Sequence, residues 1–261
     1  MLYIDINSDL GESFGHYQLG DTAAILDIVS SANLACGCHA GDPMVMHKTV
    51  EMCVEKNVAI GAHVGYPDLQ GFGRRKMDLS FDEIYNYTLY QLGALEAFTR
   101  VCGTRIRHVN GHGALGNLSH KDEKVAHAIV KAAYDFDPSL LIVATRESSC
   151  MNKFAKEYGM GTILNVFHID RNYEEDLSLV PRGTPKAMIE DDEYALQRVI
   201  RAVKERHVYA VTGKDIEIPT PKRVLIHGDQ PKALLFAQRL RNTLEGEGVN
   251  ICYCGDMPKE F

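Results

Sequence analysis

Short apolar runs rich in β-branched residues alternate along the chain with longer segments in which apolar positions recur at helical spacing. Most short runs end in a polar or glycine-rich turn, which is typical of strands that lead into helices. The runs predict strands at 2–6, 31–35, 58–62, 106–109, 140–144, 162–166, 224–226 and 249–251. The longer segments predict helices at 44–56, 81–101, 123–134, 148–158, 192–205 and 232–244. This β-α alternation predicts a parallel sheet with right-handed crossovers.

Polar residues suited to catalysis follow almost every predicted strand instead of gathering at one point. An open, doubly wound sheet binds its ligands at a switch point, whereas a barrel collects functional residues from many strand ends. The predicted fold is therefore α/β, a parallel (β/α) barrel of seven or eight strands. We expect one domain over 1–261, with a small β-hairpin inserted near 207–218, around the turn-like sequence TGKD. Long loops at 65–78 and 168–189 interrupt the alternation, and loops of such length usually serve function.

The amino-acid composition excludes some kinds of binding partner but does not change the predicted fold. The chain has 261 residues, 45% of them hydrophobic, and a formal net charge of −7. Because lysine and arginine do not cluster, we expect neither nucleic acid nor an anionic membrane as a partner. No apolar run reaches the roughly 18 residues of a membrane span, and the sequence MLYIDINSDL lacks the features of a secretion signal. The seven cysteines are odd in number and irregularly spaced, so we expect reduced thiols in a cytoplasmic protein.

The ends of the predicted strands carry a recurring set of carboxylates, imidazoles and amides. In a barrel these ends form one rim, which is where barrel enzymes place their active sites. We therefore predict an active site at this rim. The candidates for acid–base or water-positioning roles are Asp9, Glu12, His39, His63, His112, Asp170 and Asp229, and those for substrate binding are Asn7, Arg74, Asn117 and Arg171.

Two kinds of chemistry suit such a site. Carboxylates and imidazoles whose pKa values are tuned by burial can act as general acids and bases. Alternatively, Asp9, His39 and His63 can hold a divalent metal that lowers the pKa of a bound water. Because Asp9, His39 and His63 are far apart in the sequence and none of them belongs to a short H-x-x-x-H motif, we favour acid–base catalysis without a tightly bound metal. Arg74 is a candidate to bind a carboxylate or a phosphate.

One segment partly matches two nucleotide-binding motifs. GHGALG at 111–116 fits G-x-G-x-x-G between a strand and a helix, but it falls in the fourth β-α unit and no acidic residue ends the next strand. The same stretch is close to a P-loop, with Asn117 where the phosphate-binding lysine belongs. The sequence therefore predicts no self-contained nucleotide site.

Several loop sequences, in order along the chain, resemble those of the LamB/YcsF family. The strings that carry the resemblance are IDINSDLGESFG, SANLACGCHAGDP, AIGAHVGYPDLQGFGRR, YQLGAL, HVNGHGALGN, Asp170-Arg171 with Tyr173, LVPR and IHGD. The resemblance implies a barrel related to the glycoside hydrolase/deacetylase type.

The characterised role of that family is as one component of the ATP-dependent bacterial 5-oxoprolinase. The resemblance thus implies that the lactam of 5-oxoproline is opened to glutamate, with ATP and Mg²⁺ used by the complex. It also implies two partner subunits, B and C, which are allophanate-hydrolase-like. Because a five-membered lactam recloses readily, phosphorylating its amide oxygen before water attacks activates the carbonyl and drives the opening.

One loop departs from the family pattern. The usual H-V-K-P-H-G-A-L-Y-N reads HVNGHGALGN, so Asn110, Gly111 and Gly116 stand where lysine, proline and tyrosine are usual. Loss of the lysine charge predicts weaker binding of an anionic group, and we expect Asn110→Lys with Gly111→Pro to tighten it. Two alternatives stay open: a non-catalytic or regulatory barrel with a partly lost site, and a metal-dependent, deacetylase-like hydrolase acting alone. A homo-oligomer is also left open.

Overall fold

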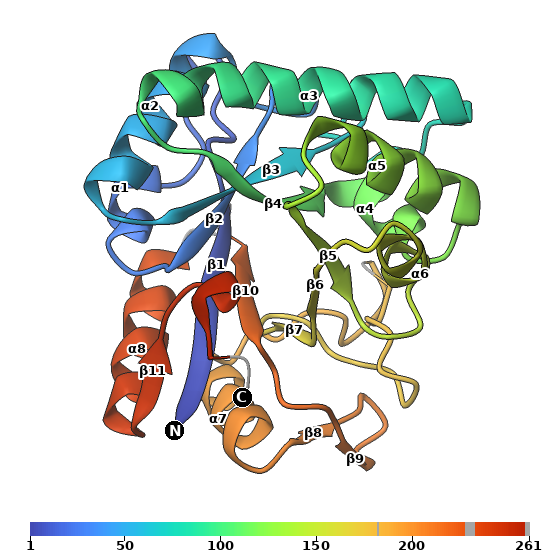
Figure 1. Cartoon of the computed structure of the whole chain (residues 1–261). Helices are drawn as coiled ribbons and strands as arrows, with labels where there is room; N and C mark the ends of the chain where they lie inside the picture. The colour runs from blue at the N-terminus through green and yellow to red at the C-terminus, as the bar shows by residue number, and fades with distance from the viewer. Residues whose placement is uncertain (182, 228–232, 259–261) are drawn as a thin grey trace.

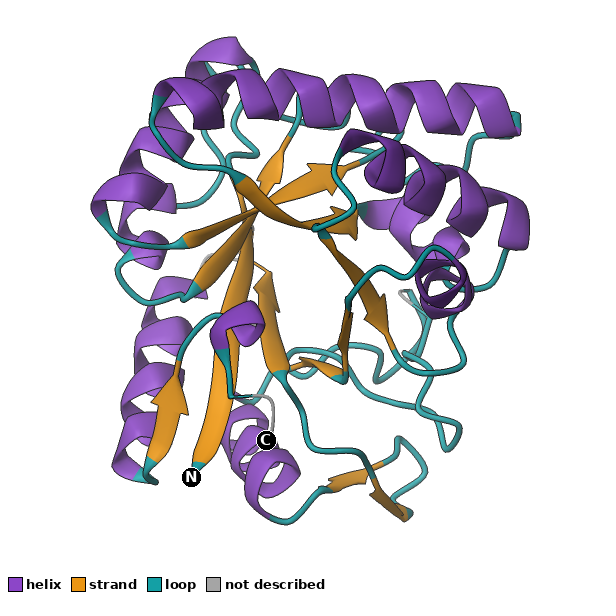
Figure 2. Cartoon of the chain, in the orientation of Figure 1, coloured by secondary structure: helices purple, strands orange, loops and turns teal. Residues whose placement is uncertain are grey.

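The computed structural model describes residues 1–181, 183–227 and 233–258. In this part of the chain, eight parallel strands run in the order β6-β5-β4-β3-β2-β1-β10-β7 and curl into a nearly closed barrel (Figure 1). Helices cover the outside of most of the barrel, whereas loops lie beside β6 and β7 (Figure 2). The predicted parallel (β/α) barrel is confirmed. The eight strands are β1 Leu2–Leu10, β2 Ser31–Ala35, β3 Ala59–Val64, β4 Ile106–Gly111, β5 Leu141–Thr145, β6 Thr162–Leu164, β7 Val166–His168 and β10 Arg223–His227.

Two of the eight predicted strands differ from expectation. The run 162–166 is not one strand, because Asn165 adopts a φ of 56° and separates β6, which pairs with β5, from β7, which pairs with β10. The backbone of Asn165 is hydrogen-bonded on both sides, to Thr145 and to Lys222. The run 249–251 forms β11 (Val249–Ile251), which pairs with the first residues of β1 and lies off the barrel path. The eighth barrel strand therefore comes from dividing one run.

The six predicted helices are present, with ends within two residues of expectation: α2 Pro43–Glu55, α3 Phe81–Val101, α5 Glu123–Phe136, α6 Cys150–Glu157, α7 Asp192–Lys204 and α8 Ala233–Gly246. Local chemistry explains their starts. The Ser80 and Glu83 side chains form a reciprocal capping box on α3. Asp42 accepts hydrogen bonds from two backbone N–H groups of α2, and Pro43 occupies its first turn.

Two short helices, α1 (Thr22–Leu26) and α4 (Gly113–Ser119), were not predicted. Helix α4 begins within the glycine-rich GHGALG stretch, whose composition disfavours a helix. It forms because the structure around it holds its first turn, including a hydrogen bond from Ala114 N–H to the Gly73 carbonyl. Tertiary contact here overrides local propensity.

Alternation along the first two strands gives the barrel an unusually polar interior. Successive side chains of a strand point to opposite faces. In β1, Ile4 and Ile6 belong to the main hydrophobic core, whereas Asp5 and Asn7 form hydrogen bonds with side chains of β2. These polar residues are buried, with Asp5 and Asn7 both fully inaccessible. The interior of a barrel of this type is usually filled by branched aliphatic side chains, so these polar residues need explaining.

A two-stranded antiparallel sheet lies where the hairpin near 207–218 is expected. It pairs β8 (His207–Tyr209) with β9 (Asp215–Glu217). Among the described residues, no helix combines the length and the apolar character needed to cross a lipid bilayer.

Candidate active site

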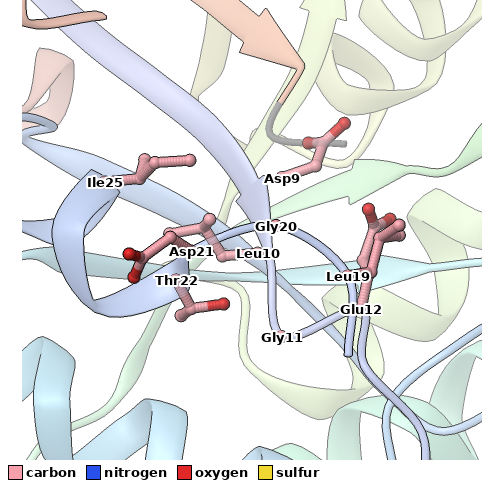
Figure 3. A pocket seen from close by; sticks show the side chains of 9 residues that line it. All are labelled: Asp9, Leu10, Gly11, Glu12, Leu19, Gly20, Asp21, Thr22 and Ile25. Atoms are coloured by element: carbon pink, nitrogen blue, oxygen red, sulfur yellow. The ribbon is translucent and has the colours of Figure 1, made fainter. Parts of the chain in front are cut away.

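Four adjacent strands, β1 to β4, bring their carboxyl ends together at one side of the barrel. Asp9 lies at the end of β1 and Glu12 in the loop that follows, as Figure 3 shows. His63 lies in β3, His39 in the turn between β2 and α2, and His112 at the N-cap of α4. The loop after β1 also borders a separate pocket of about 10 Å³, which has room for one water but not for a substrate.

Glu12, His39, His63 and His112 form a compact group, called here the histidine–glutamate group. One potential ligand atom from each lies within 4.8 Å of the others. The Glu12 Oε1 atom is 3.2 Å from His39 Nε2, 3.5 Å from His112 Nδ1 and 3.9 Å from His63 Nε2. The His39 and His112 rings are stacked with centroids 3.7 Å apart. Because the Glu12 side chain is only 7% exposed, its charge is poorly screened by water.

The hydrogen bonds of His63 and His112 to backbone carbonyls determine which nitrogen of each ring carries a hydrogen. His63 Nδ1 is 3.2 Å from the Asn110 carbonyl oxygen, and His112 Nε2 is 2.8 Å from that of Phe72. Carbonyl oxygens only accept, so both of these nitrogens carry a hydrogen. The inner nitrogens, His63 Nε2 and His112 Nδ1, lie 2.9 Å apart. In two neutral rings both would present lone pairs, so this contact requires a proton or a cation between or beside them.

The charges around the three imidazoles favour a proton on His63. Burial alone lowers the pKa of His63, but the negative charge of Asp9, a hydrogen bond to it and the charge of Glu12 raise the pKa above its ordinary value. Burial and the other two histidines hold the pKa of His39 well below 6.5. Burial and His63 lower the pKa of His112 to about 3. The site therefore contains one readily protonated imidazole beside two neutral ones.

The donor atoms of the histidine–glutamate group fit a divalent metal. Three imidazole nitrogens and a carboxylate oxygen are a ligand set that suits zinc and related ions. The outer hydrogen bonds of His63 and His112 to carbonyls are of the kind that orient metal-bound histidines. The sequence proposed Asp9 with His39 and His63 as ligands. The structure instead groups those two histidines with Glu12 and His112.

Asp9 lies beside the histidine–glutamate group. Its Oδ2 atom is 3.4 Å from His63 Nε2, and its Oδ1 atom accepts a hydrogen bond of 2.7 Å from Asn33 Nδ2. The carboxylate is thus held between an imidazole and an amide, with 12% of the side chain exposed. It can interact with His63 or with a ligand in the adjoining cavity.

A cavity of about 1050 Å³ opens beside the group and continues into the barrel. This volume lies at the upper end of the range for small-molecule sites, so a small cyclic amide leaves much of it unfilled. The predicted site residues that line it are Asn7, Asp9, Glu12, His63, Arg74, His112, Asn117 and Arg171.

Two predicted site residues are not among the described residues that line the cavity, and a third cannot be placed. His39 lies behind it, stacked on His112. Asp170 follows β7, and its charge acts on Tyr173 and on the buried Arg198. Asp229 lies outside the described residues. For Asp170 and Asp229, catalytic roles stay predictions from the sequence.

The two arginines proposed for substrate binding differ in their surroundings. Arg74 is exposed at the cavity wall, with its guanidinium 5.0 Å from the Phe72 ring centroid. Arg171 is 7% exposed, and its Nη2 donates a hydrogen bond of 2.5 Å to the Val180 carbonyl. Arg171 therefore helps to hold the long loop after β7, while Arg74 is accessible to a ligand.

The altered loop after β4 contains two glycines in close backbone contact. A Cβ on Gly111 would lie 2.7 Å from Gly116 Cα, and a Cβ on Gly116 would lie 2.1 Å from the Gly111 oxygen. Gly111→Pro therefore cannot be accommodated without moving the backbone, which argues against the double substitution expected to tighten binding. Asn110 lines the cavity, so Asn110→Lys alone is the better test of a missing cation.

Asn33 was not among the predicted site residues, although it contacts Asp9; it lies inside the apolar run SANLA. The sequence pattern that indicates Asn33 is the alternation of Ser31 and Asn33 with the apolar Ala32 and Leu34. Polar residues at every second position of a buried strand indicate a polar face inside the barrel.

His120 provides a pH-dependent test of the cavity wall. Burial and the charges of Arg146 and Lys121 lower the pKa of His120 to about 4. The unfolded chain, with a pKa near 6.5, therefore binds more protons between these values, and stability is lost as the pH falls from about 6.5 towards 4. When the pH is lowered from 7 to 5, the free energy of unfolding should fall in both proteins. The fall should be about 2 kcal/mol smaller in His120→Gln than in the unmodified protein. Urea denaturation at both pH values measures this, with the exposed His16→Gln as control. The same loss in all three proteins would contradict the prediction.

Fold and site together define a parallel (β/α)-barrel protein with a buried carboxylate–histidine site at the carboxyl ends of its strands. The site opens on a cavity suited to a small ligand. The chain belongs to the LamB/YcsF family, whose model matches residues 4–259. The resemblance inferred from the loop sequences is confirmed.

Proteins similar to this chain cover nearly its whole length. The A subunit of 5-oxoprolinase from Oceanobacillus iheyensis is 46% identical, over 95% of this chain and 95% of the relative. That of Pyrococcus abyssi is 48% identical, over 95% and 96%. The crystal structure of a lactam utilization protein from Thermus thermophilus has a TM-score of 0.90 at 38% identity, covering 96% of this chain and 99% of that chain. The family 4 carbohydrate esterase of Streptomyces lividans shares the fold alone, with a TM-score of 0.51 at 10% identity over 95% of this chain and 91% of that chain.

Proposed function

We propose that this protein is one component of an ATP-dependent amidohydrolase that opens the lactam of 5-oxoproline to give L-glutamate. The observation that carries the proposal is the similarity, over almost the whole chain, to proteins named as the A subunit of 5-oxoprolinase. The site supports it, because buried carboxylates next to imidazoles are what proton transfer during amide hydrolysis requires. The substitutions in the loop after β4 leave this group intact, which favours a catalytic protein over a regulatory one.

The proposed reaction adds water to the lactam carbonyl carbon, after which the ring C–N bond breaks and the nitrogen takes up a proton. Glu12 or Asp9 accepts the proton of the attacking water. His63 donates a proton to the departing nitrogen, consistent with its raised pKa. His39 and His112 stay neutral and orient the water. Arg74 and Asn117 bind the carboxylate and amide of the substrate in the cavity. Asn7 is fully buried and hydrogen-bonded to Ser31 and Asn33, so it supports the site from inside the barrel.

The histidine–glutamate group would hold any divalent metal that the reaction uses. A metal bound there supplies positive charge that stabilises the developing oxyanion and lowers the pKa of water. Its presence would also satisfy the facing lone pairs of His63 and His112, which lie 2.9 Å apart. Without a metal, the proton on His63 separates the facing lone pairs of His63 and His112.

The proposal assigns ATP and Mg²⁺ to the complex with subunits B and C. The stretch of this chain that is close to a P-loop has Asn117 in place of the lysine that binds phosphate. ATP use also favours the cytoplasm as the location. Phosphorylation of the lactam oxygen by the complex, which converts ATP to ADP, would prepare the carbonyl for attack at the histidine–glutamate group. Once the C–N bond breaks, the phosphate is left on the new carboxyl group as an acyl phosphate, and a second water releases it as inorganic phosphate to give glutamate.

The experiment that tests the proposal is reconstitution. We expect the isolated chain to release little or no glutamate from 5-oxoproline, and addition of subunits B and C with ATP and Mg²⁺ to restore release. Glutamate and ADP are measured together, with omission of ATP as the control. Robust turnover by the chain alone without ATP would contradict the proposal.

A deacetylase-like hydrolase acting alone is the second candidate, and the observation that favours it is the metal-compatible histidine–glutamate group. This candidate predicts about one zinc-type ion per chain and hydrolysis of acetylated substrates without ATP. Elemental analysis of the purified protein, with His39→Ala as the matched metal-poor variant, tests the first part. Bound metal with no hydrolysis of acetyl groups would leave the first proposal as the better one.

A further inference from the structure

The polar barrel interior forms a directed series of hydrogen bonds that ends on Asp9. Ser31 Oγ donates to Asp5 Oδ1 over 2.8 Å and accepts from Asn7 Nδ2 over 2.7 Å. Asn7 Oδ1 in turn accepts from Asn33 Nδ2 over 2.7 Å. Since a carboxylate only accepts, the direction of each of these bonds follows from Asp5.

Asn33 joins this series to Asp9. Its Nδ2 donates to Asp9 Oδ1 as well as to Asn7, both over 2.7 Å. Its Oδ1 is 2.7 Å from Nε2 of His108. Because both Nδ2 hydrogens are donated to oxygens, the orientation of the Asn33 amide is fixed. Its Oδ1 can only accept, so His108 Nε2 must carry a hydrogen. The hydrogen bond from His108 Nε2 thus reinforces the amide orientation that Asp9 and Asn7 require.

The surroundings of His108 leave it one hydrogen bond, the one from Nε2 to Asn33. The residue is completely buried, and its other nitrogen, Nδ1, has no hydrogen-bond partner among the described residues. Its ring crosses over Gly61 of the neighbouring strand, where a Cβ would lie 2.1 Å from His108 Nε2. Burial lowers the pKa of His108 well below 6.5, and the charge of Arg223 lowers it further, so the ring stays neutral with a single hydrogen. A residue chosen only to fill space would be apolar and would leave no buried nitrogen unsatisfied.

We propose that His108 and Asn33 are positioning residues, which hold the Asp9 carboxylate in the orientation that its reaction with substrate and its contact with His63 require. This inference rests on the proposed function of the site and adds residues to which no role has been given. His108 is not among the described residues that line the cavity, and its hydrogen bond connects it to the site through Asn33.

The test replaces His108 in two ways in the reconstituted complex. His108→Gln keeps an N–H donor near the position of Nε2, whereas His108→Leu fills the space and removes the donor. We expect His108→Leu to lower kcat about 10- to 100-fold with KM changed less than about twofold, and His108→Gln to restore most of the loss. In an Asp9→Asn background, His108→Leu should lower the residual rate no further, because the two act through the same contact.

Two glycine-to-alanine substitutions, at Gly61 and Gly93, provide a further test and its control. Gly61→Ala leaves His108 in the sequence but displaces its ring, so it should lower kcat as His108→Leu does. Gly93→Ala, on α3, introduces a Cβ with nothing within 4 Å and should leave kcat unchanged. Equal losses in His108→Gln and His108→Leu, or additive losses with Asp9→Asn, would overturn the proposal.

A second readout does not depend on turnover. The side-chain amide hydrogens of Asn33 should give slowly exchanging NMR signals that are retained in His108→Gln and shifted and rapidly exchanging in His108→Leu. If the unmodified complex releases no glutamate, the proposed function fails, and the amide signals alone decide whether His108 orients Asn33. Unchanged amide signals in His108→Leu would refute the positioning role whatever the activity.

Discussion

Asp9→Asn should lower kcat for glutamate release about 1,000-fold while leaving the melting temperature almost unchanged. The substitution keeps the shape of the side chain but removes the charge that raises the pKa of His63 and one of the two carboxylates proposed to accept a proton from water. Asn33 can still contact the replaced side chain, so packing is retained. The measurement is steady-state turnover of the reconstituted complex together with thermal melting of the chain.

Asp122→Asn is the matched control for this substitution. Asp122 caps α5 by accepting from Val125 N–H and has no contact with the histidine–glutamate group. Asparagine is an equally good N-cap, so both kcat and the melting temperature should be retained. Normal turnover by Asp9→Asn would show that the active site lies elsewhere, whereas unfolding of the variant would show a structural role for Asp9.

Asp5→Asn should lower the free energy of unfolding by about 3–5 kcal/mol. Asp5 is completely buried and Arg223 is 1% exposed, and the Asp5 Oδ2 atom lies 2.9 Å from Arg223 Nε and 2.8 Å from Nη2. Removing the carboxylate charge leaves the guanidinium buried without its counter-ion and disturbs the hydrogen bonds of Ser31. Urea denaturation measures the change as a lower midpoint with the same slope.

An exposed ion pair provides the comparison. Asp27 is 64% exposed and pairs with Lys56, so Asp27→Asn should change the unfolding free energy by less than about 1 kcal/mol. Similar effects of Asp5→Asn and Asp27→Asn would mean that burial does not strengthen the Asp5–Arg223 pair.

Sequence periodicity predicted the barrel and most helix ends because local chemistry decides them. The start of α3 follows from Ser80 and Glu83, which are three residues apart and cap it without any distant contact. The run 162–166 was misread because the division at Asn165 depends on hydrogen bonds to Thr145 and Lys222, which are remote in sequence. Periodicity cannot detect a change of partner within one run.

The candidate site was predictable as a region but not in its internal geometry. Parallel strands bring their carboxyl ends to one rim, so histidines at or just after the ends of β2, β3 and β4 were expected to meet, and they do. Which carboxylate lies among them depends on the path of the loop after β1, and that path brings in Glu12 where the sequence had proposed Asp9. Asn33 was missed because its neighbours in the chain are apolar, and only the fold pairs it with Asp9 and His108.

The backbone contact between Gly111 and Gly116 bears on how this loop has evolved. A side chain at either position requires the other segment to move, since the backbones approach too closely for a Cβ on Gly111 or on Gly116. A proline at the first position and a tyrosine at the second therefore cannot be gained one at a time in the present loop. Any lineage that exchanged one version of the loop for the other passed through a rearranged backbone, so the residues at 111 and 116 are expected to be inherited as a pair.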